Sequence, residues 1–262
     1  MIILQTDRLS ITFGGVRAID GVNIAIESGQ VFSIIGPNGS GKTTLFNLVS
    51  GIYTPDDGTV QFAGETVTGL SPDNLARRGL SRTFQNLQIF SRMSVLENVM
   101  VGRQRHERTG ILADLLHLPA VARQNEATAE AAHAALARVG LASSSDRSAA
   151  ALAYGALKRL EIARALASEP TLLLLDEPAA GCNPVETQEI EGVIRSIVKD
   201  GITVVLVEHD MRLVMNISDR VHVLAHGRTL AEGSPEQVRS DPAVVEAYLG
   251  VHGSQEATRA FD

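Results

Sequence analysis

The chain has 262 residues, of which 44% are hydrophobic and 20% charged, a balance typical of globular domains that bury a sizeable core. Its net charge of −7 argues against a protein that coats nucleic acid, and its single cysteine, Cys182, excludes an internal disulfide and suits a reducing compartment. The longest apolar runs are only as long as strands and the N-terminus has no signal-like stretch, so we expect no membrane-spanning segment.

The first third of the sequence alternates between strand-like segments and turns. Residues 22–26 alternate apolar and polar, as in a half-buried strand, and residues 31–35 are continuously apolar, as in a buried parallel strand. A glycine-rich turn follows and leads into a helix predicted over 44–49. The turn TPDDG then precedes another short strand, predicted over 59–63.

The middle of the sequence, roughly residues 94–167, is expected to be almost entirely helical. Ser94 followed by Glu97 indicates a capping box that opens one helix. The polar, alanine-rich stretch 123–139 favours a second helix.

The last third alternates again between strands and helices. Strands are predicted over 172–175 and 203–207, and helices from Pro184 and after Asp210. Such alternation is typical of a mostly parallel α/β sheet, so we expect a helical block inserted into an α/β core. The sequence after Gly250 is polar and is expected to be a mobile tail.

The octapeptide GPNGSGKT, residues 36–43, fits the phosphate-loop pattern G-x-x-x-x-G-K-[ST], with an apolar strand before it and a helix after it. Glycines let backbone N–H groups surround phosphate oxygens, and the helix adds its positive N-terminal end. Lys42 would bridge the β- and γ-phosphates, and the Thr43 hydroxyl would hold Mg²⁺. The flanks disfavour the alternative of a plain glycine turn. The residues expected to contact nucleotide are Gly36, Pro37, Asn38, Gly39, Ser40, Gly41, Lys42, Thr43 and Thr44.

Two carboxylates end the apolar segment LLLLDEP, residues 172–178. A buried strand that ends in acids beside a phosphate turn places them at the same edge of the sheet. Asp176 is expected to reach Mg²⁺, and Glu177 to lie near the γ-phosphate and accept a proton from the attacking water. The phosphate loop in the same chain disfavours the alternative, a solvated strand end with two incidental acids.

Two further polar residues could belong to the same site. His209 follows the next apolar strand and could contact the γ-phosphate, although a lone histidine at a strand end is often merely structural. Gln85 follows a short apolar stretch, where a neutral amide could position water or act as a metal ligand. Spacing alone leaves both roles open.

Taken in order, the segments 36–43, Gln85, LAYGA, LLLLDEP and VEHD resemble the motifs of ATP-binding cassette (ABC) ATPases over nearly the whole chain. SRTFQNLQIF, EIARALASEPTLLLLDEPAAGCNP and GSPEQVRSDPAVVEAYLG further resemble one branch of that superfamily. That branch is the larger of the two ATPase subunits of branched-chain amino acid uptake systems, with relatives serving urea, amides and aromatic acids.

The resemblance implies an α/β fold, a P-loop NTPase (RecA-like) core with an antiparallel β subdomain and an inserted helical subdomain. A single ABC ATPase domain would span residues 1–250. Its core and β subdomain would occupy 1–93 and 168–250, its helical signature subdomain 94–167, and a polar tail 251–262.

The resemblance also implies roles for matching positions. Gln85 would be the loop glutamine that senses nucleotide and contacts the membrane subunits, with its oxygen near the metal. His209 would be the switch histidine, and Phe13 the aromatic residue that stacks on adenine. Asn183, in the loop that links the two sites of a dimer, stands where many superfamily members carry aspartate.

The segment LAYGA, residues 152–156, resembles the ABC signature, usually Leu-Ser-Gly-Gly-Gln, which caps the ATP held by the opposite subunit. Gly155 would keep a helix N-terminus whose N–H groups face the partner's ATP. Ala153 lacks the usual serine hydroxyl, and Ala156 and Leu157 depart from the branch, which usually carries glutamine at both. We therefore expect an asymmetric dimer in which the ATP held by this chain's own phosphate loop is hydrolysed better.

The resemblance thus implies an ATPase subunit of an importer, with ATP and Mg²⁺ as cofactors and branched-chain amino acids or a related small polar solute as cargo. Its partners would be a second ABC ATPase, two transmembrane permeases and, indirectly, an extracytoplasmic solute-binding protein, with no nucleic acid. It would lie peripherally at the cytoplasmic face of the cell membrane. An apolar cluster, either core or a docking groove for the permeases, is formed by Phe84, Leu87, Ile89 and Phe90.

Three alternatives compete with the importer hypothesis. Soluble ABC ATPases that act on DNA or ribosomes usually carry tandem cassettes or a coiled-coil insertion, which this acidic chain lacks. A P-loop kinase or GTPase is disfavoured by the helical block between Lys42 and Asp176. A non-catalytic binding subunit stays open only if Glu177 or His209 is misplaced.

Overall fold

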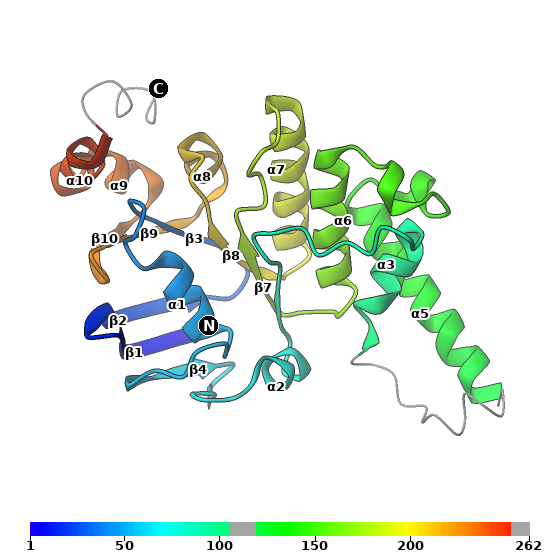
Figure 1. The fold of residues 1–262 in the computed structure, drawn as a ribbon, viewed down its shortest axis with the longest axis horizontal. Helices are drawn as coiled ribbons and strands as arrows, with labels where there is room; N and C mark the ends of the chain where they lie inside the picture. The colour runs from blue at the N-terminus through cyan, green and yellow to red at the C-terminus, as the bar shows by residue number, and fades with distance from the viewer. Residues whose placement is uncertain (105–118, 253–262) are drawn as a thin grey trace.

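The computed structural model describes residues 1–104 and 119–252, which form two sheets and several groups of helices (Figure 1). The first sheet is antiparallel, with strand order β2-β1-β4-β5. Its strands are β1 Ile2–Phe13, β2 Val16–Glu27, β4 Asp57–Phe62 and β5 Glu65–Thr66. Along β2 buried and exposed residues largely alternate, because only one face of this sheet meets the core.

The second sheet has the order β10-β9-β3-β8-β7-β6, and all its pairs are parallel except β10 with β9. Its strands are β3 Val31–Ile35, β6 Leu80–Arg82, β7 Leu172–Asp176, β8 Thr203–Val207, β9 Arg220–Ala225 and β10 Arg228–Gly233. Every residue of β3, β7 and β8 is buried, as continuous apolar strands covered on both faces must be. The predicted mostly parallel α/β sheet is confirmed.

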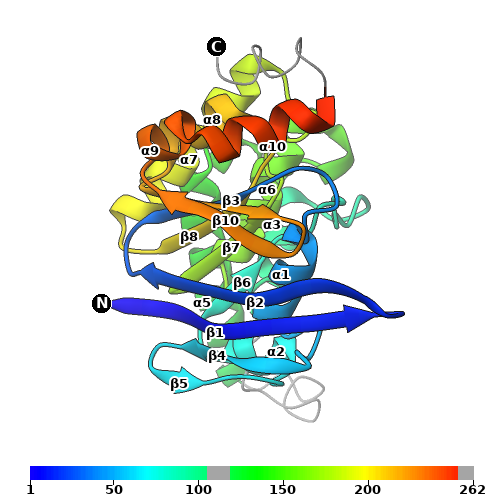
Figure 2. The same ribbon diagram turned by 90° about the vertical axis from the view of Figure 1, so that its left-hand side faces the viewer.

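Helices cover both faces of the second sheet. α9 and α10 lie on the side away from the first sheet (Figure 2). On the other side α1 lies between the two sheets, where its Leu45 and Phe46 join a core cluster with residues of both. These helices and their neighbours are α1 Lys42–Val49, α2 Pro72–Arg77, α7 Pro184–Lys199, α8 Met211–Ile217, α9 Pro235–Ser240 and α10 Pro242–His252.

The remaining helices form a block at one end of the molecule (Figure 1). They are α3 Val95–Val101, α5 Pro119–Arg138 and α6 Tyr154–Leu166, with the short 3₁₀ turns η2 Ala142–Ser144 and η3 Ala149–Ala151. The predicted capping box at the start of α3 is confirmed. The Glu97 N–H donates to Ser94 Oγ at 3.1 Å, and the Ser94 N–H donates to Glu97 Oε2 at 2.7 Å. The stretch 105–118, within the predicted helical region, lies outside the described residues.

Strand β7 shows how one apolar run serves two cores. Leu172 and Leu174 belong to the cluster between the sheets, whereas Leu173 and Leu175 belong to the cluster shared with α7 and the helical block. Because successive side chains point to opposite faces of a strand, both faces of this sheet are packed. The acids that follow the run therefore emerge at the edge of a rigid element.

The structure differs from the sequence-based expectation mainly near the C-terminus. α10 runs to His252, into the predicted tail, because Val244 and Tyr248 pack it against β9 and β10. The rest of that tail, 253–262, lies outside the described residues. Across the described ranges, we find no helix with the length and apolar character required to cross a bilayer.

Candidate nucleotide site

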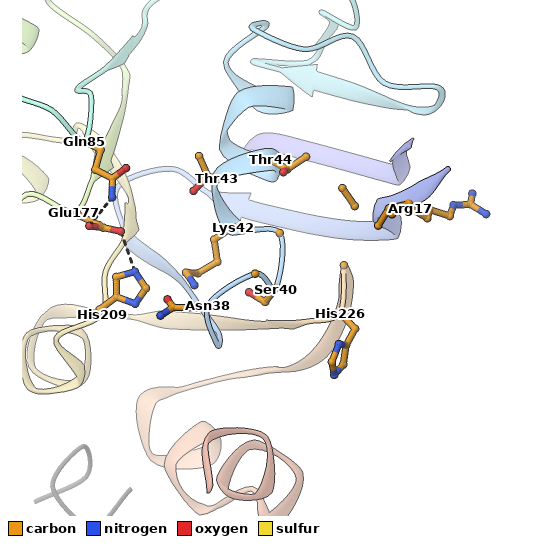
Figure 3. A pocket seen from close by; sticks show the side chains of 15 residues that line it. Arg17, Asn38, Ser40, Lys42, Thr43, Thr44, Gln85, Glu177, His209 and His226 are labelled. Atoms are coloured by element: carbon orange, nitrogen blue, oxygen red, sulfur yellow. Dashed lines mark hydrogen bonds and ion pairs between the residues drawn. The ribbon is translucent and has the colours of Figure 1, made fainter. Parts of the chain in front are cut away.

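A cleft of about 570 Å³ lies where loops from both sheets meet the N-terminal end of α1 (Figure 3). The phosphate-loop residues from Asn38 to Thr44 line it, whereas Gly36 and Pro37 do not. Side chains that follow β7 and β8 form one wall of the cleft. The β1–β2 hairpin and the turn between β9 and β10 form the other wall. The lining residues are Val16, Arg17, Ala18, Asn38, Gly39, Ser40, Gly41, Lys42, Thr43, Thr44, Gln85, Glu177, His209, His226 and Gly227.

Glycine is required at two points of the phosphate loop. Gly36 has φ +151°, and a Cβ there would lie 2.0 Å from the Leu224 carbonyl oxygen. Gly41, the N-cap of α1, has φ +106°, and a Cβ there would lie 2.8 Å from the Ala18 carbonyl oxygen. Since neighbouring backbone cannot move aside, only glycine allows this loop to curl against β9 and the hairpin.

Lys42, the first residue of α1, carries a buried ammonium group. Its Nζ donates to the carbonyl oxygens of Gly36 at 2.7 Å and Pro37 at 3.1 Å. Burial lowers the pKa of Lys42, and the nearby negative charge of Glu177 opposes that shift. A buried cation bonded only to neutral carbonyl groups favours an anion as its next partner.

Ser40 gives an independent sign that this loop is built for a ligand. Its hydroxyl is buried, yet it has no hydrogen-bond partner among the residues that the structure describes. Such orphaned groups are rare and costly in folded proteins. A phosphate oxygen in the cleft would supply the missing partner, so the loop fits a nucleoside triphosphate.

Glu177 is held by side chains from two other loops (Figure 3). Gln85 Nε2 donates to Glu177 Oε2 at 3.0 Å, and His209 Nε2 lies 2.9 Å from Oε1. The Glu177 backbone has φ +49°, a conformation uncommon outside glycine. It is fixed by an N–H donated to the Val207 carbonyl at 2.9 Å and by Lys158 Nζ, which donates to the Glu177 carbonyl at 3.2 Å. The three residues expected to be catalytic therefore lie in direct contact.

Asp176, an expected metal ligand, ends β7 but does not line the cleft. Its Oδ2 accepts a hydrogen bond from Arg82 Nη2 at 2.8 Å, and both side chains are buried. The other two expected ligands, Thr43 and Gln85, do line the cleft.

The donor set nevertheless suits Mg²⁺. Within 1–104 and 119–252 there is no group of three or more His, Cys, Asp or Glu side chains that could hold a metal ion. Magnesium, however, is usually bound through one or two carboxylates, substrate phosphates and water rather than by an all-protein cage. The hydroxyl, amide and carboxylate oxygens at this edge of the sheet fit that mode of binding.

Gly155, expected to face a partner's ATP, is the second residue of α6. Its N–H donates to Glu186 Oε1 at 3.1 Å, and a Cβ at Gly155 would lie 2.5 Å from Glu186 Cγ. The other oxygen of Glu186 accepts the N–H of Asn183, the N-cap of α7, at 3.0 Å. The structure thus places this signature N–H against a carboxylate of the same chain.

Phe13, expected to stack on adenine, is 44% exposed and lies edge-on to Tyr53, with 5.2 Å between ring centroids. It does not line the cleft, whereas its hairpin partner Val16 does. Sequence reasoning missed Arg17 and His226, which also line the cleft. Of these two residues, only His226 has a sequence signal, because the His-Gly pair between β9 and β10 is typical of a turn.

Glu208 is a further residue that the motifs did not single out. Its buried carboxylate accepts the N–H of Ala179 at 2.8 Å and of His209 at 3.0 Å. Burial raises the pKa of Glu208, and these hydrogen bonds oppose the shift. The residue joins the loops after β7 and β8 and so fixes His209 relative to Glu177.

A second cleft, of about 730 Å³, lies between β6, the loop after it, α3 and α6. The predicted apolar cluster of Phe84, Leu87, Ile89 and Phe90 lines it. Phe84 and Phe90 are 46% and 48% exposed, so the cluster is not simply core. The guanidinium carbon of Arg164 lies 5.9 Å from the Phe90 ring centroid, which adds a cation to an otherwise aromatic wall.

Comparison with known proteins gives matches along the chain. The family model described as "ABC transporter" matches residues 19–180, and the one described as "Branched-chain amino acid ATP-binding cassette transporter" matches residues 228–254. The high-affinity branched-chain amino acid transport ATP-binding protein BraF of Pseudomonas aeruginosa is 46% identical over 249 residues, covering 95% of this chain and 98% of BraF. The protein LivG of Escherichia coli, described in the same words, is 43% identical over the same shares.

Solved structures give the same result. An ATP-binding cassette of an ABC transporter in its ADP conformation matches with a TM-score of 0.84 and 37% identity. A nucleotide-free ATP-binding cassette from an ABC transporter matches with a TM-score of 0.83 and 36% identity. Each comparison covers 95% of this chain and 99% of the solved chain, so the similarity includes the sheets and the helical block alike.

Proposed function

The chain belongs to the ABC transporter ATP-binding family, in its branched-chain amino acid branch, and from this premise we propose that it powers solute import. Its ATPase activity would drive uptake of branched-chain amino acids, or of a related small polar solute, across the cytoplasmic membrane. The observation that carries the proposal is the position of Glu177, which Gln85 and His209 hold in the phosphate-loop cleft (Figure 3).

Nucleotide binding would use groups that the chain leaves available. The loop N–H groups and the ammonium of Lys42 would contact the β- and γ-phosphates, and the Ser40 hydroxyl would gain its missing partner. Thr43, Gln85 and Asp176 would hold Mg²⁺, which neutralises charge developing on the phosphates when it is bound.

Hydrolysis would depend on the orientation of one carboxylate. Glu177 would accept a proton from the attacking water, while Gln85 helps to position that water and His209 contacts the γ-phosphate. Because both neighbours already bond the carboxylate, little reorganisation would be needed when ATP arrives. The left-handed backbone at Glu177 serves the same purpose, since it fixes where the side chain leaves the strand.

Two kinds of partner protein would complete the transporter complex. The signature end of α6 would face the ATP of a second, non-identical ABC ATPase, and closure of the pair over two nucleotides would accompany binding. The second cleft, with its exposed Phe84 and Phe90, would receive a segment of one of the two permease subunits. The protein would then lie at the cytoplasmic face of the membrane, with an extracytoplasmic binding protein supplying solute and no nucleic acid involved.

Mass spectrometry of proteins that co-purify from mild detergent extracts of native membranes tests the partners. We expect two multi-span permeases and a second cassette ATPase. Recovery of ribosomal proteins or nucleic acid with no permease would contradict the importer. Uptake of labelled leucine, compared with labelled urea, in cells lacking the gene would test the cargo, since only loss of leucine uptake agrees with the favoured substrate.

A further inference from the structure

Arg82, the last residue of β6, forms a buried ion pair with Asp176, the last residue of β7. Arg82 Nη2 and Asp176 Oδ2 are 2.8 Å apart, and the side chains are only 8% and 4% exposed. Removing one member of a buried pair leaves an uncompensated charge, so such pairs are far harder to break than exposed ones. The pair therefore fixes the orientation of the Asp176 carboxylate.

The same guanidinium reaches helix α1. Its Nη1 donates to Asn47 Oδ1 and to Ser50 Oγ, both at 2.7 Å. Asn47 lies on α1 and Ser50 caps its C-terminal end. Because α1 begins at Lys42 and carries Thr43, Arg82 connects the Asp176 carboxylate to the helix that bears another expected Mg²⁺ ligand.

The segment after Arg82 holds the same strand end. The N–H of Asp176 donates to Thr83 Oγ1 at 3.2 Å, and Gln85 donates to Glu177 as described above. One short segment thus contacts both acids that follow the apolar run of β7. Arg82, the residue directly before this segment, touches the Asp176 carboxylate itself.

Two aromatic rings lie close to the guanidinium group of Arg82. Its central carbon lies 5.3 Å from the ring centroid of Phe46, which is buried, and 5.6 Å from that of Phe84. Phe84 and Arg82 both line the second cleft. Rings that exclude water from a cation strengthen its ion pairs by lowering the local dielectric constant. Arg82 therefore lies between the second cleft and the expected metal side of Asp176.

We propose that Arg82 is a positioning residue for the metal site, orienting the Asp176 carboxylate toward the Mg²⁺ that accompanies ATP, an inference that rests on the proposed function. The hydrogen bond uses Oδ2, so Oδ1 is the oxygen offered to the metal or its water shell. Arginine suits this task because its planar fork can bond a carboxylate and α1 at once, which a lysine ammonium cannot do in the same geometry. Its positive charge repels a cation, so it acts by orientation and not by attraction.

The test is the magnesium dependence of ATP binding in Arg82→Met, which keeps an unbranched side chain but removes the fork. ATP affinity of the full chain would be measured by calorimetry in EDTA and across a magnesium series. We expect affinity in EDTA to stay within about two-fold, while the half-saturating Mg²⁺ concentration rises about ten-fold, as the loss of one charged hydrogen bond predicts. Arg82→Lys should give a smaller rise, about three-fold.

Arg78→Met provides the matched control. Arg78 caps the C-terminus of α2 and pairs with Glu65 on the surface, so its loss should leave the magnesium requirement unchanged. An unchanged requirement in folded Arg82→Met would overturn the proposal. If that variant does not fold, an unchanged requirement in Arg82→Lys would overturn it equally. Failure of the unmodified chain to bind ATP at all would instead overturn the proposed function.

Discussion

The phosphate-loop cleft and the signature end of α6 differ in whether their polar groups already have hydrogen-bond partners within the chain. In the cleft, the Ser40 hydroxyl has no hydrogen-bond partner among the described residues, and the Lys42 ammonium donates its hydrogen bonds to the neutral carbonyl groups of Gly36 and Pro37. At the signature end, the Gly155 N–H is already bonded to Glu186. The chain therefore presents one site whose groups require a ligand and one helix end that its own side chains satisfy.

The reason for the difference lies in the residue that precedes α6. Ala153 is the N-cap of α6 and provides no side-chain hydrogen bond. The carboxylate of Glu186 supplies one from α7 while also capping α7 itself through Asn183. A negative charge at two helix N-termini is favourable at both. One side chain thus replaces the cap that alanine cannot provide.

The largest effect is expected from Glu177→Gln in the cleft. Loss of the proton acceptor should lower ATP hydrolysis by about 10²- to 10⁴-fold while MgATP binding is retained. Lys42→Ala should instead weaken binding, because it removes the cation from the loop. Phosphate release and equilibrium ATP affinity, measured on both variants, separate the two effects. Full activity of the glutamine variant would exclude the general-base role.

Substitutions at Gly36 in the cleft and at Gly155 at the signature end should differ in their effect on the free energy of unfolding. Gly36→Ala would place a Cβ 2.0 Å from a backbone oxygen that cannot move, so we expect a loss of about 3 kcal/mol in the free energy of unfolding. Gly155→Ala meets the flexible end of Glu186, and the better helix propensity of alanine offsets part of the cost, leaving about 1 kcal/mol at most. Urea unfolding of both variants measures the difference, and equal losses would refute it.

Glu186→Ala tests whether the contact at the signature end stabilises the fold. The variant loses the cap on α6 and the capping box of α7, so unfolding should become easier by about 1–2 kcal/mol. Glu191→Ala is the control on the same helix, because Glu191 pairs with Arg195 one turn away and its loss should cost less than about 0.5 kcal/mol. Similar losses in the two variants would mean that the Gly155 contact contributes nothing.

The smallest effect concerns the altered signature. Ala153→Ser together with Ala156→Gln restores two residues usual in ABC signatures, and turnover of the assembled transporter should rise about two- to five-fold, as one added hydrogen bond predicts. Ala153→Ser alone separates the effect of the serine hydroxyl, including its capping of α6, from that of the glutamine. Unchanged turnover in the double variant would show that the alteration is neutral and would remove the case for an asymmetric dimer.

Features with a local cause could be predicted from the sequence. The apolar runs of β3 and β8 match the observed strands, and the Ser94–Glu97 capping box needs only residues three apart. The phosphate loop and the two acids at the end of β7 were recognisable because each motif lies within one short segment. The meeting of the phosphate loop and Glu177 in one cleft follows from the rule that parallel strands end at the same edge of a sheet, whereas Asp176 does not line that cleft.

Features that join distant segments could not be predicted in this way. Arg82 lies on a strand of three residues, and nothing in its neighbourhood indicates a partner on β7. The bond from Gly155 to Glu186 depends on how α6 packs beside α7, which periodicity does not specify. His226 reaches the cleft only because β10 folds back on β9 in a tight turn. Each of these contacts follows from the arrangement of elements and not from any one of them.

The left-handed backbone of Glu177 lowers the stability of the fold but keeps a side chain that the nucleotide site needs. Non-glycine residues in this conformation cost of order 1–3 kcal/mol each when the surroundings enforce them, and His226, with φ +49°, is another such residue lining the same cleft. Glycine at either position would relieve that strain but would also delete a side chain from the cleft. Selection of this protein for thermal stability alone should therefore favour substitutions that remove side chains from its nucleotide site. A screen for more stable variants should for this reason also measure transport.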